Sequence, residues 1–264
     1  MNFWMAAAGR MAANLKVAVL GAGYFAQFPH EAWGRIPGAR LVAVADLDPS
    51  RAARAAMQDG LIGQPMQITF RLRTGDGQGA RAYLDRQPYF QQMPKFLVHE
   101  TAVHWIVTFR YLAGDPVDVY ADLRRENPAI AGEGAGYILS SHPNGVRSIF
   151  DGNRHLDHPA DNHRLTLGEA LIEGTTGTLS LLGFGELTLR AFGSTDNAPL
   201  LQPQDWPGFA GDCVHALQKH VVRGALHGAP LETKARDYLT VRRIENAAYA
   251  SAANGAKIKL DGAA

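Results

Sequence analysis

Glu100 and His104 have side-chain types and a spacing that could carry out proton transfer. They lie four residues apart in the segment Glu100 to Ala113, whose apolar spacing predicts a helix that stops at Gly114. Residues at this spacing share a helix face, here together with Thr108. A carboxylate beside an imidazole raises the imidazole pKa and can orient the ring, which suits a general acid or base near neutral pH. An ordinary surface Glu–His pair would give the same pattern.

A glycine-rich turn near the start of the chain has the spacing of a dinucleotide-binding motif. The apolar run Lys16 to Leu20 leads into Gly21, Gly23 and Ala26, in the pattern G-x-G-x-x-A, and then into a segment that can be helical. The first glycine permits a tight turn, the second lets the backbone approach a pyrophosphate, and the small third residue lets the helix pack on the strand. Amide groups at the helix N-terminus would face the phosphate charge.

Asp46 ends the second apolar run, Leu41 to Ala45, where a ribose-binding carboxylate belongs. This carboxylate favours NAD because it would repel a 2′-phosphate, whereas Arg51 and Arg54 nearby leave NADP open. The predicted cofactor-binding residues are Gly21, Gly23, Tyr24, Phe25 and Asp46.

Other polar residues have weaker patterns. His155, His158 and His163 could bind a metal, but a solvated loop explains them more simply, and we predict no metal site. The single cysteine, Cys213, excludes an intrachain disulfide and fits a helix core in a reducing, cytoplasmic environment. Side chains that could face a polyol substrate as hydrogen-bond donors are Arg71, Arg73, Arg147, Asn153 and Arg154.

The elements that must position these residues change character near residue 60. The first segment reads as a β-α-β unit followed by a helix over 48–57. From 65 to 73 the pattern alternates, as in a strand with one solvated face. Later strands are expected at 117–123, 136–141, 146–150, 164–173, 178–182, 186–192 and 257–260, with helices at 208–223 and 234–254. We therefore predict an α/β plus α+β protein: a truncated Rossmann-like segment over 15–60 and a mostly antiparallel sheet domain with helices over 61–264.

Composition argues against some partners. The chain has 26 basic and 25 acidic residues, so no net field attracts nucleic acid or an anionic membrane. No apolar stretch reaches the roughly 18 residues that a spanning helix needs.

Four stretches in order resemble the glucose–fructose oxidoreductase / inositol dehydrogenase (Gfo/Idh/MocA) family. They are VAVLGAGYFAQ…LVAVADLDPSRA, GLIGQP, HETAVHWI and IENAAYASAANGAKIKL. The third resembles the family's D-x-G-x-H-x-x-D helix. The resemblance runs over nearly the whole chain.

The resemblance implies an NAD(P)-dependent oxidoreductase acting on a hydroxyl or carbonyl of a sugar or cyclitol by hydride transfer. His104 then matches the general acid/base and Glu100 its carboxylate partner, a longer acid where aspartate is usual. Val107 replaces the aspartate that closes the family's helix. The resemblance also implies a homo-oligomer formed through the antiparallel sheet.

The second half of a Rossmann cofactor domain has no counterpart in this sequence. A second Rossmann half needs on the order of 80 to 100 residues, and the interval from Leu47 to Gln64 is far shorter. None of the six lysines stands in the family's Glu-Lys-Pro motif. An internal deletion would impair activity, so the alternative is a catalytically inactive remnant that acts as a binding or oligomerisation module. We expect residues 15–57 to pack on the larger domain or on another subunit, or to be marginally stable.

Overall fold

The structure is a computed structural model, and it describes residues 15–16, 35, 39–40, 49–203, 212–232 and 234–260. The chain divides into two compact units. The small unit comprises Met1–Leu47 and Asp212–Glu232, and the sheet unit comprises Asp48–Gly211 and Thr233–Ala264. The predicted cofactor residues Gly21, Gly23, Tyr24, Phe25 and Asp46 lie outside the described residues.

The sheet unit is built on one mixed sheet, in which nine strands are described, in the order β10-β9-β8-β7-β3-β6-β5-β4-β11. The strands are β3 (Pro65–Leu72), β4 (Asp118–Arg124), β5 (Ala135–Ser141), β6 (Arg147–Asn153), β7 (Gly168–Gly174), β8 (Gly177–Leu181), β9 (Leu187–Ala191), β10 (Ala198–Leu201) and β11 (Ile258–Lys259). Helices α2 (Pro49–Gln58), α3 (Val103–Ala113) and α5 (Ala235–Asn254) belong to the same unit. The predicted class, a sheet domain with helices, is confirmed.

Strands β3 and β6 form a parallel pair in the middle of the sheet, while the other described pairs of this sheet are antiparallel. Phe70 lies opposite Phe150 in their register. The carboxyl ends of two parallel strands meet at one edge of a sheet. The residues that follow β3 and those that follow β6 are therefore brought together.

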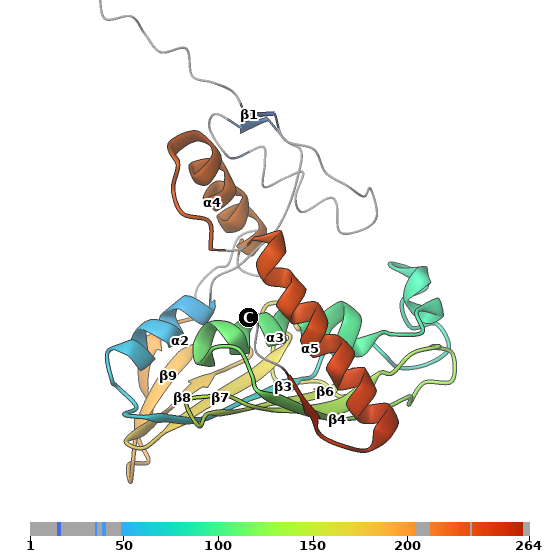
Figure 1. The fold of residues 1–264 in the computed structure, drawn as a ribbon, viewed down its shortest axis with the longest axis horizontal. Helices are drawn as coiled ribbons and strands as arrows, with labels where there is room; N and C mark the ends of the chain where they lie inside the picture. Colours follow the sequence, from blue (N-terminus) through green and yellow to red (C-terminus); the bar gives the residue numbers. More distant parts are fainter. Residues whose placement is uncertain are drawn as a thin grey trace, which may run out of the picture. The chain divides into compact units, whose positions relative to one another are not determined.

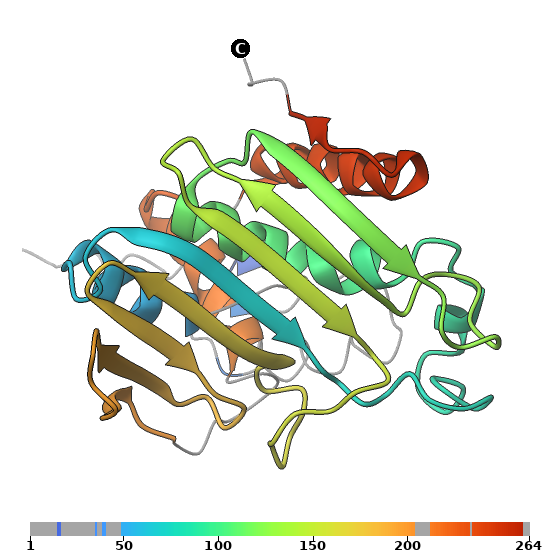
Figure 2. The same ribbon diagram turned by 90° about the horizontal axis from the view of Figure 1, so that it is seen from below.

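The sheet has one face against the helices and one face without them (Figures 1 and 2). On β3, the apolar side chains of Ile68, Phe70 and Leu72 are buried, as the alternating sequence predicts. Phe70 is fully buried and its ring stacks on that of Trp105 from α3. We call the opposite side, which carries Thr69 on β3, the open face.

Several element boundaries differ from the prediction. The segment 164–167 forms turns and a bend, and β7 begins only at Gly168, which has a φ of 150°. A Cβ at this position would lie 1.8 Å from the Arg71 carbonyl oxygen, so a larger residue does not fit here. Strand β10 is absent from the prediction because its short sequence APLL does not alternate. The predicted helix over 100–113 is two structures: a π-helix, η3 (Leu97–Ala102), and then α3.

Helix α2 packs on the sheet unit. Ala53 and Ala56 are part of its core, and the guanidinium of Arg54 lies 4.2 Å from the centre of the Tyr111 ring on α3. The end of the 15–57 segment is thus part of the sheet unit, and the expectation for the rest of that segment stays a prediction. Among the described residues from 49 to 65, only this helix and a turn precede β3, so no further parallel strand is inserted there. The boundary between 60 and 61 stays a prediction.

The small unit contains β1 (Leu15–Lys16) and β2 (Ala39–Arg40), which pair in parallel, together with α4 (Cys213–His227). A parallel pair requires a crossover connection, as the predicted β-α-β unit has. Cys213 is buried, as expected of a core residue. Burial alone would raise the pKa of Asp212, but its ion pair with Arg35, together with His215, outweighs burial and holds this pKa below its usual value.

Candidate functional site

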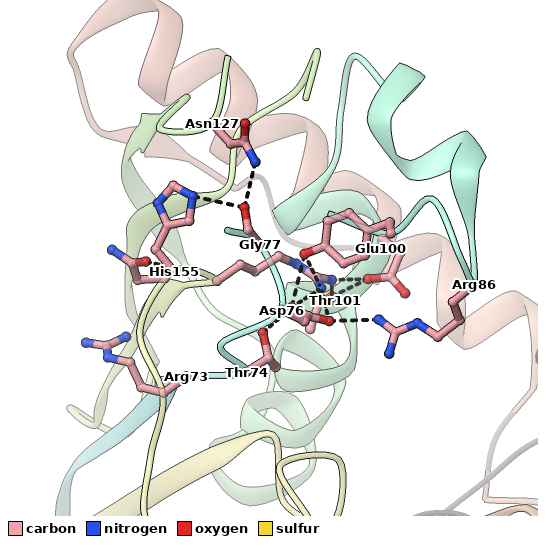
Figure 3. A network of polar contacts seen from close by, with 12 residues as sticks. Arg73, Thr74, Asp76, Gly77, Arg86, Glu100, Thr101, Asn127 and His155 are labelled. Carbon is pink, nitrogen blue, oxygen red and sulfur yellow. Dashed lines mark hydrogen bonds and ion pairs between the residues drawn. The ribbon is translucent and has the colours of Figure 1, made fainter. Parts of the chain in front are cut away.

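A polar network lies where the carboxyl ends of β3 and β6 meet η3. Thr74 and Asp76 follow β3, Arg154 follows β6, and Glu100 and Thr101 come from η3. Figure 3 shows Asp76, Glu100, Thr101 and Arg86 gathered at this edge. We call this set the arginine network; its members are Thr74, Asp76, Tyr83, Arg86, Glu100, Thr101 and Arg154.

Arg154 is the centre of the arginine network. Its side chain is 5% exposed, and one terminal nitrogen contacts both Glu100 Oε2 and Thr101 Oγ1. The other donates to Asp76 Oδ1 and to the Tyr83 hydroxyl, each at 3.3 Å. The guanidinium also lies 4.5 Å from the centre of the Phe96 ring. A buried cation is tolerated only with such partners, since leaving it unpaired would cost several kcal/mol.

The charges of the network stabilise one another. Burial opposes the charge of Arg154, but Glu100, followed by Tyr83 and Asp76, outweighs burial and raises the pKa of the guanidinium. Burial also disfavours the ionised form of Asp76. The charge of Arg154 and hydrogen bonds from the neighbours of Asp76 outweigh burial and hold the pKa of Asp76 below its usual value. Those neighbours are Thr74 at 2.6 Å, Arg86 at 2.9 Å and Tyr83 at 3.0 Å. Two guanidinium groups and two carboxylates are therefore held together here.

The loop after β3 approaches Arg154 closely because residue 77 is glycine. The Gly77 amide donates to the Arg154 carbonyl at 2.9 Å. A Cβ at this position would lie 2.9 Å from the Cβ of Arg154 and 3.1 Å from its carbonyl oxygen. A larger residue would push the Asp76 loop away from the guanidinium.

Glu100 and His104 have different surroundings in the structure. The Glu100 carboxylate contacts Arg154 and the Thr101 hydroxyl. The His104 side chain is exposed, and with the described residues its imidazole forms no hydrogen bond or ion pair. The predicted Glu100–His104 contact is therefore not among the contacts of the described chain. A π-helical turn holds an extra residue compared with an α-helical one, which rotates Glu100 relative to the α-helix that follows.

Two further buried carboxylates, which the sequence did not indicate, also contact η3 and the residue before it. Glu133 Oε1 accepts hydrogen bonds from the amides of Phe96 at 3.1 Å and Val98 at 3.0 Å, and from the Tyr249 hydroxyl at 2.6 Å. Burial, with the neighbouring Glu133 carboxylate, raises the pKa of Tyr249 strongly. Glu245 of α5 is fully buried and contacts His99 at 2.9 Å. η3 is thus held by contacts with Arg154, Glu133 and Glu245.

Of the donors predicted to face a polyol, only Arg154 lies in the arginine network. Arg71 and Arg147 are exposed, and Arg71 pairs with Glu169 of β7. Arg73 is buried but contacts Asp151, and Asn153 donates to Glu126. Asp76, Tyr83 and Thr101 were missed because they lie far from Arg154 in the sequence and no motif joins them.

Two of the three histidines considered as metal ligands contact backbone carbonyl groups. His155 contacts the Gly77 carbonyl at 2.9 Å, and His158 contacts the Arg73 carbonyl at 2.6 Å. Within the described chain no group of three or more histidine, cysteine, aspartate or glutamate side chains is arranged to hold a metal ion. In the same part of the chain, no helix has both the length and the apolar character to cross a bilayer.

Comparison with known proteins agrees with this fold. A family model described as the GFO/IDH/MocA C-terminal domain matches residues 50–180. A D-apiose dehydrogenase of Rhizobium rhizogenes is 29% identical over 218 residues, which are 80% of this chain and 61% of that protein. The chain therefore spans about three fifths of the length of this curated relative.

Solved structures agree with the family model. An oxidoreductase from Agrobacterium radiobacter, in complex with NAD+, L-tartaric acid and magnesium, has a TM-score of 0.67 and 27% identity, covering 80% of this chain and 61% of that one. The aldose-aldose oxidoreductase of Caulobacter crescentus, complexed with glycerol, has a TM-score of 0.60 and 19% identity, covering 80% and 60%. The mixed sheet with its helices is that of the C-terminal domain of these oxidoreductases. The family model, the curated relative and the solved structures together support the assignment of this chain to the Gfo/Idh/MocA family.

Proposed function

We propose that the chain is an NAD(P)-dependent oxidoreductase that acts on a sugar or cyclitol hydroxyl or carbonyl by hydride transfer. The observation that carries this proposal is the exposed imidazole of His104, which lies on α3 directly after the turn that belongs to the arginine network, in a chain of this family. An exposed imidazole can accept a hydroxyl proton from a substrate or return it to a carbonyl oxygen. The A. radiobacter relative in complex with NAD+ and the D-apiose dehydrogenase support this choice.

The residues present fit the first half of a dinucleotide site. The parallel pair of β1 and β2 is the arrangement that the motif requires on either side of its helix. The residues proposed to hold the cofactor are Gly21, Gly23, Tyr24, Phe25 and Asp46, with NAD favoured over NADP. When bound, a nicotinamide dinucleotide supplies the hydride acceptor or donor. His104 would move the proton at the substrate oxygen, and Glu100 and Arg154 would shape the adjoining polar surface.

We also propose that the chain forms a homo-oligomer through the open face. Three large side chains on this face are exposed: Tyr137 by 47%, Leu139 by 39% and Leu171 by 41%. Leu139 pairs with Ile149, Ile149 with Thr69, and Thr69 with Leu171, so one row of mostly apolar residues crosses four strands. Burying such a row against a second copy would be favourable. A cytoplasmic location remains a prediction, supported by the free Cys213.

The alternative is a catalytically inactive remnant that binds or oligomerises through the sheet unit. The observation that favours it is the short passage from α2 to β3, which contains no further strand among the described residues. A nicotinamide group would then lack the second half of its binding fold, and hydride transfer would be impaired.

Calorimetry distinguishes these functions. NAD, NADH, NADP and NADPH are titrated at up to millimolar concentration into the chain, and turnover is measured with D-apiose, L-tartrate and glycerol. The enzyme proposal predicts binding and turnover, with turnover lost in His104→Asn while cofactor binding stays. Binding without turnover supports the remnant. If none of the four dinucleotides binds, the enzyme proposal is wrong.

A further inference from the structure

The carboxylate of Glu100 has a different partner in the structure from the one that its spacing predicts. Its position four residues before His104 suggests that it serves the imidazole. In the structure the same carboxylate is in contact with Arg154 and Thr101, while the exposed imidazole has no partner among the described residues. Arg154 and His104 are thus two alternative partners for one carboxylate.

We propose that Arg154 is a positioning residue that keeps Glu100 away from His104, so that the imidazole is left for the substrate. The guanidinium is almost wholly buried and requires ionised acceptors on both sides. Asp76 supplies one side, but it is shared with Thr74, Tyr83 and Arg86. Glu100 is the other carboxylate in contact with Arg154 within the described residues. Releasing it would leave one side of a buried cation unpaired.

The shape of η3 reinforces this choice. Glu100 and Thr101 are consecutive residues, and both contact the same terminal nitrogen of Arg154. Glu133 accepts hydrogen bonds from the amides of Phe96 and Val98 at the beginning of η3. For Glu100 to reach His104, its side chain would have to leave Arg154 while the backbone of η3 stayed in place. The geometry therefore favours the Arg154 contact whenever residue 154 is arginine.

Other charged side chains on α3 and on the helices near it have partners of their own. Arg54 of α2 lies over the Tyr111 ring, and Arg110 donates to Asp115. Glu245 of α5 contacts His99 and Arg242. Glu100 is therefore the charged group whose release would most change the surroundings of His104.

A double-mutant cycle read by NMR tests this inference. The titration midpoint of the His104 ring is measured in the full chain for four proteins: wild type, Glu100→Gln, Arg154→Met and the double variant. The chain has ten histidines, so His104→Gln identifies the signal. With Arg154 present, Glu100→Gln should leave the midpoint unchanged. Without Arg154, a freed Glu100 should raise the midpoint by about 0.3 pH units, as expected of a Glu–His pair on a helix, and Glu100→Gln should then remove the increase.

Two results would overturn the inference. A midpoint lowered by Glu100→Gln in the otherwise wild-type chain would mean that Glu100 already contacts His104. Equal midpoints for Arg154→Met and its double variant would mean that Arg154 does not control the carboxylate. If Arg154→Met does not fold, Arg154→Lys replaces it: a lysine keeps the charge without the second donor group and should give a smaller increase. If Arg154 had only a structural role, the titration midpoint of His104 in the Arg154→Met variant would not depend on Glu100.

The inference rests on the proposed function only where it assigns the His104 imidazole to the substrate. The titration needs no cofactor and no turnover, so its outcome is separate from that of the calorimetry. A chain that binds no dinucleotide could still show the predicted differences in the His104 titration midpoint.

Discussion

Arg154→Met should destabilise the chain far more than the same substitution at an exposed ion pair. Methionine keeps much of the aliphatic volume but removes the cation from Glu100 and Asp76, whose side chains are 30% and 26% exposed. Removing one partner of a fully buried pair costs about 3–5 kcal/mol. Because the two carboxylates are partly exposed and Arg86 still contacts Asp76, we expect about 2–4 kcal/mol. Arg71→Met is the matched control: this arginine is 52% exposed beside Glu169, so its loss should cost less than about 1 kcal/mol.

The effect of Arg154→Met should also depend on pH. The pKa of Asp76 is below 3.8 in the folded protein, so the carboxylate contributes stability above that value and loses it as the pH falls through the folded pKa. The difference between wild type and Arg154→Met should therefore shrink below about pH 4. Urea denaturation of both variants and wild type near pH 7 and near pH 3.5 measures this. A cost equal to that of Arg71→Met, or a difference that does not change with pH, would refute the reasoning.

Three further predictions concern other parts of the sheet unit. Phe70→Ala should cost about 3–5 kcal/mol, because its ring is fully buried against Trp105. Phe192→Ala, at an 81% exposed site, should change the urea midpoint little, and equal costs at the two sites would contradict the assigned core. Glu133→Gln weakens the acceptor of two amides and should cost about 1–3 kcal/mol, with faster hydrogen exchange at the Val98 amide; unchanged exchange would exclude the proposed clamp on η3. Burial lowers the pKa of His142 below 6.5, against the Gly114 carbonyl and the charges of Asp115 and Asp118. The contribution of neutral His142 to the free energy of unfolding is therefore present above pH 6.5. It is lost below pH 6.5, by at most about 1.4 kcal/mol per pH unit. His142→Asn should therefore lose less stability on acidification than the wild type does.

Local patterns of the sequence were enough to predict most of the sheet unit. Alternation at Ile68, Phe70 and Leu72 predicted β3, because period two places these side chains on one face. The helix α5 was predicted over 234–254 and is found over Ala235–Asn254. Such patterns can be read from the sequence because the backbone geometry of one strand or helix determines which of its side chains share a face.

The candidate site was predicted only in part, since its contacts join residues far apart in the chain. His104 and Glu100 were indicated by their spacing, but that spacing assumes a regular α-helix. Neither Asp76 nor the π-helical turn has a local signature. Glu100 is paired with Arg154, 54 positions later in the sequence. The preference of a carboxylate between two partners is decided by which partner is buried, and burial follows from the tertiary fold.

The parallel pairing of β3 and β6 is what makes the arginine network possible. If these neighbouring strands ran antiparallel, the residue after β3 and the residue after β6 would lie at opposite edges of the sheet. Parallel pairing instead places Asp76 and Arg154 at one edge, and η3 adds Glu100 and Thr101 from the covered face. Three segments must therefore be in place before His104 has its observed surroundings. It follows that substitutions in the loop after β3, although they do not contact the imidazole, should affect its chemistry through Arg154 and Glu100.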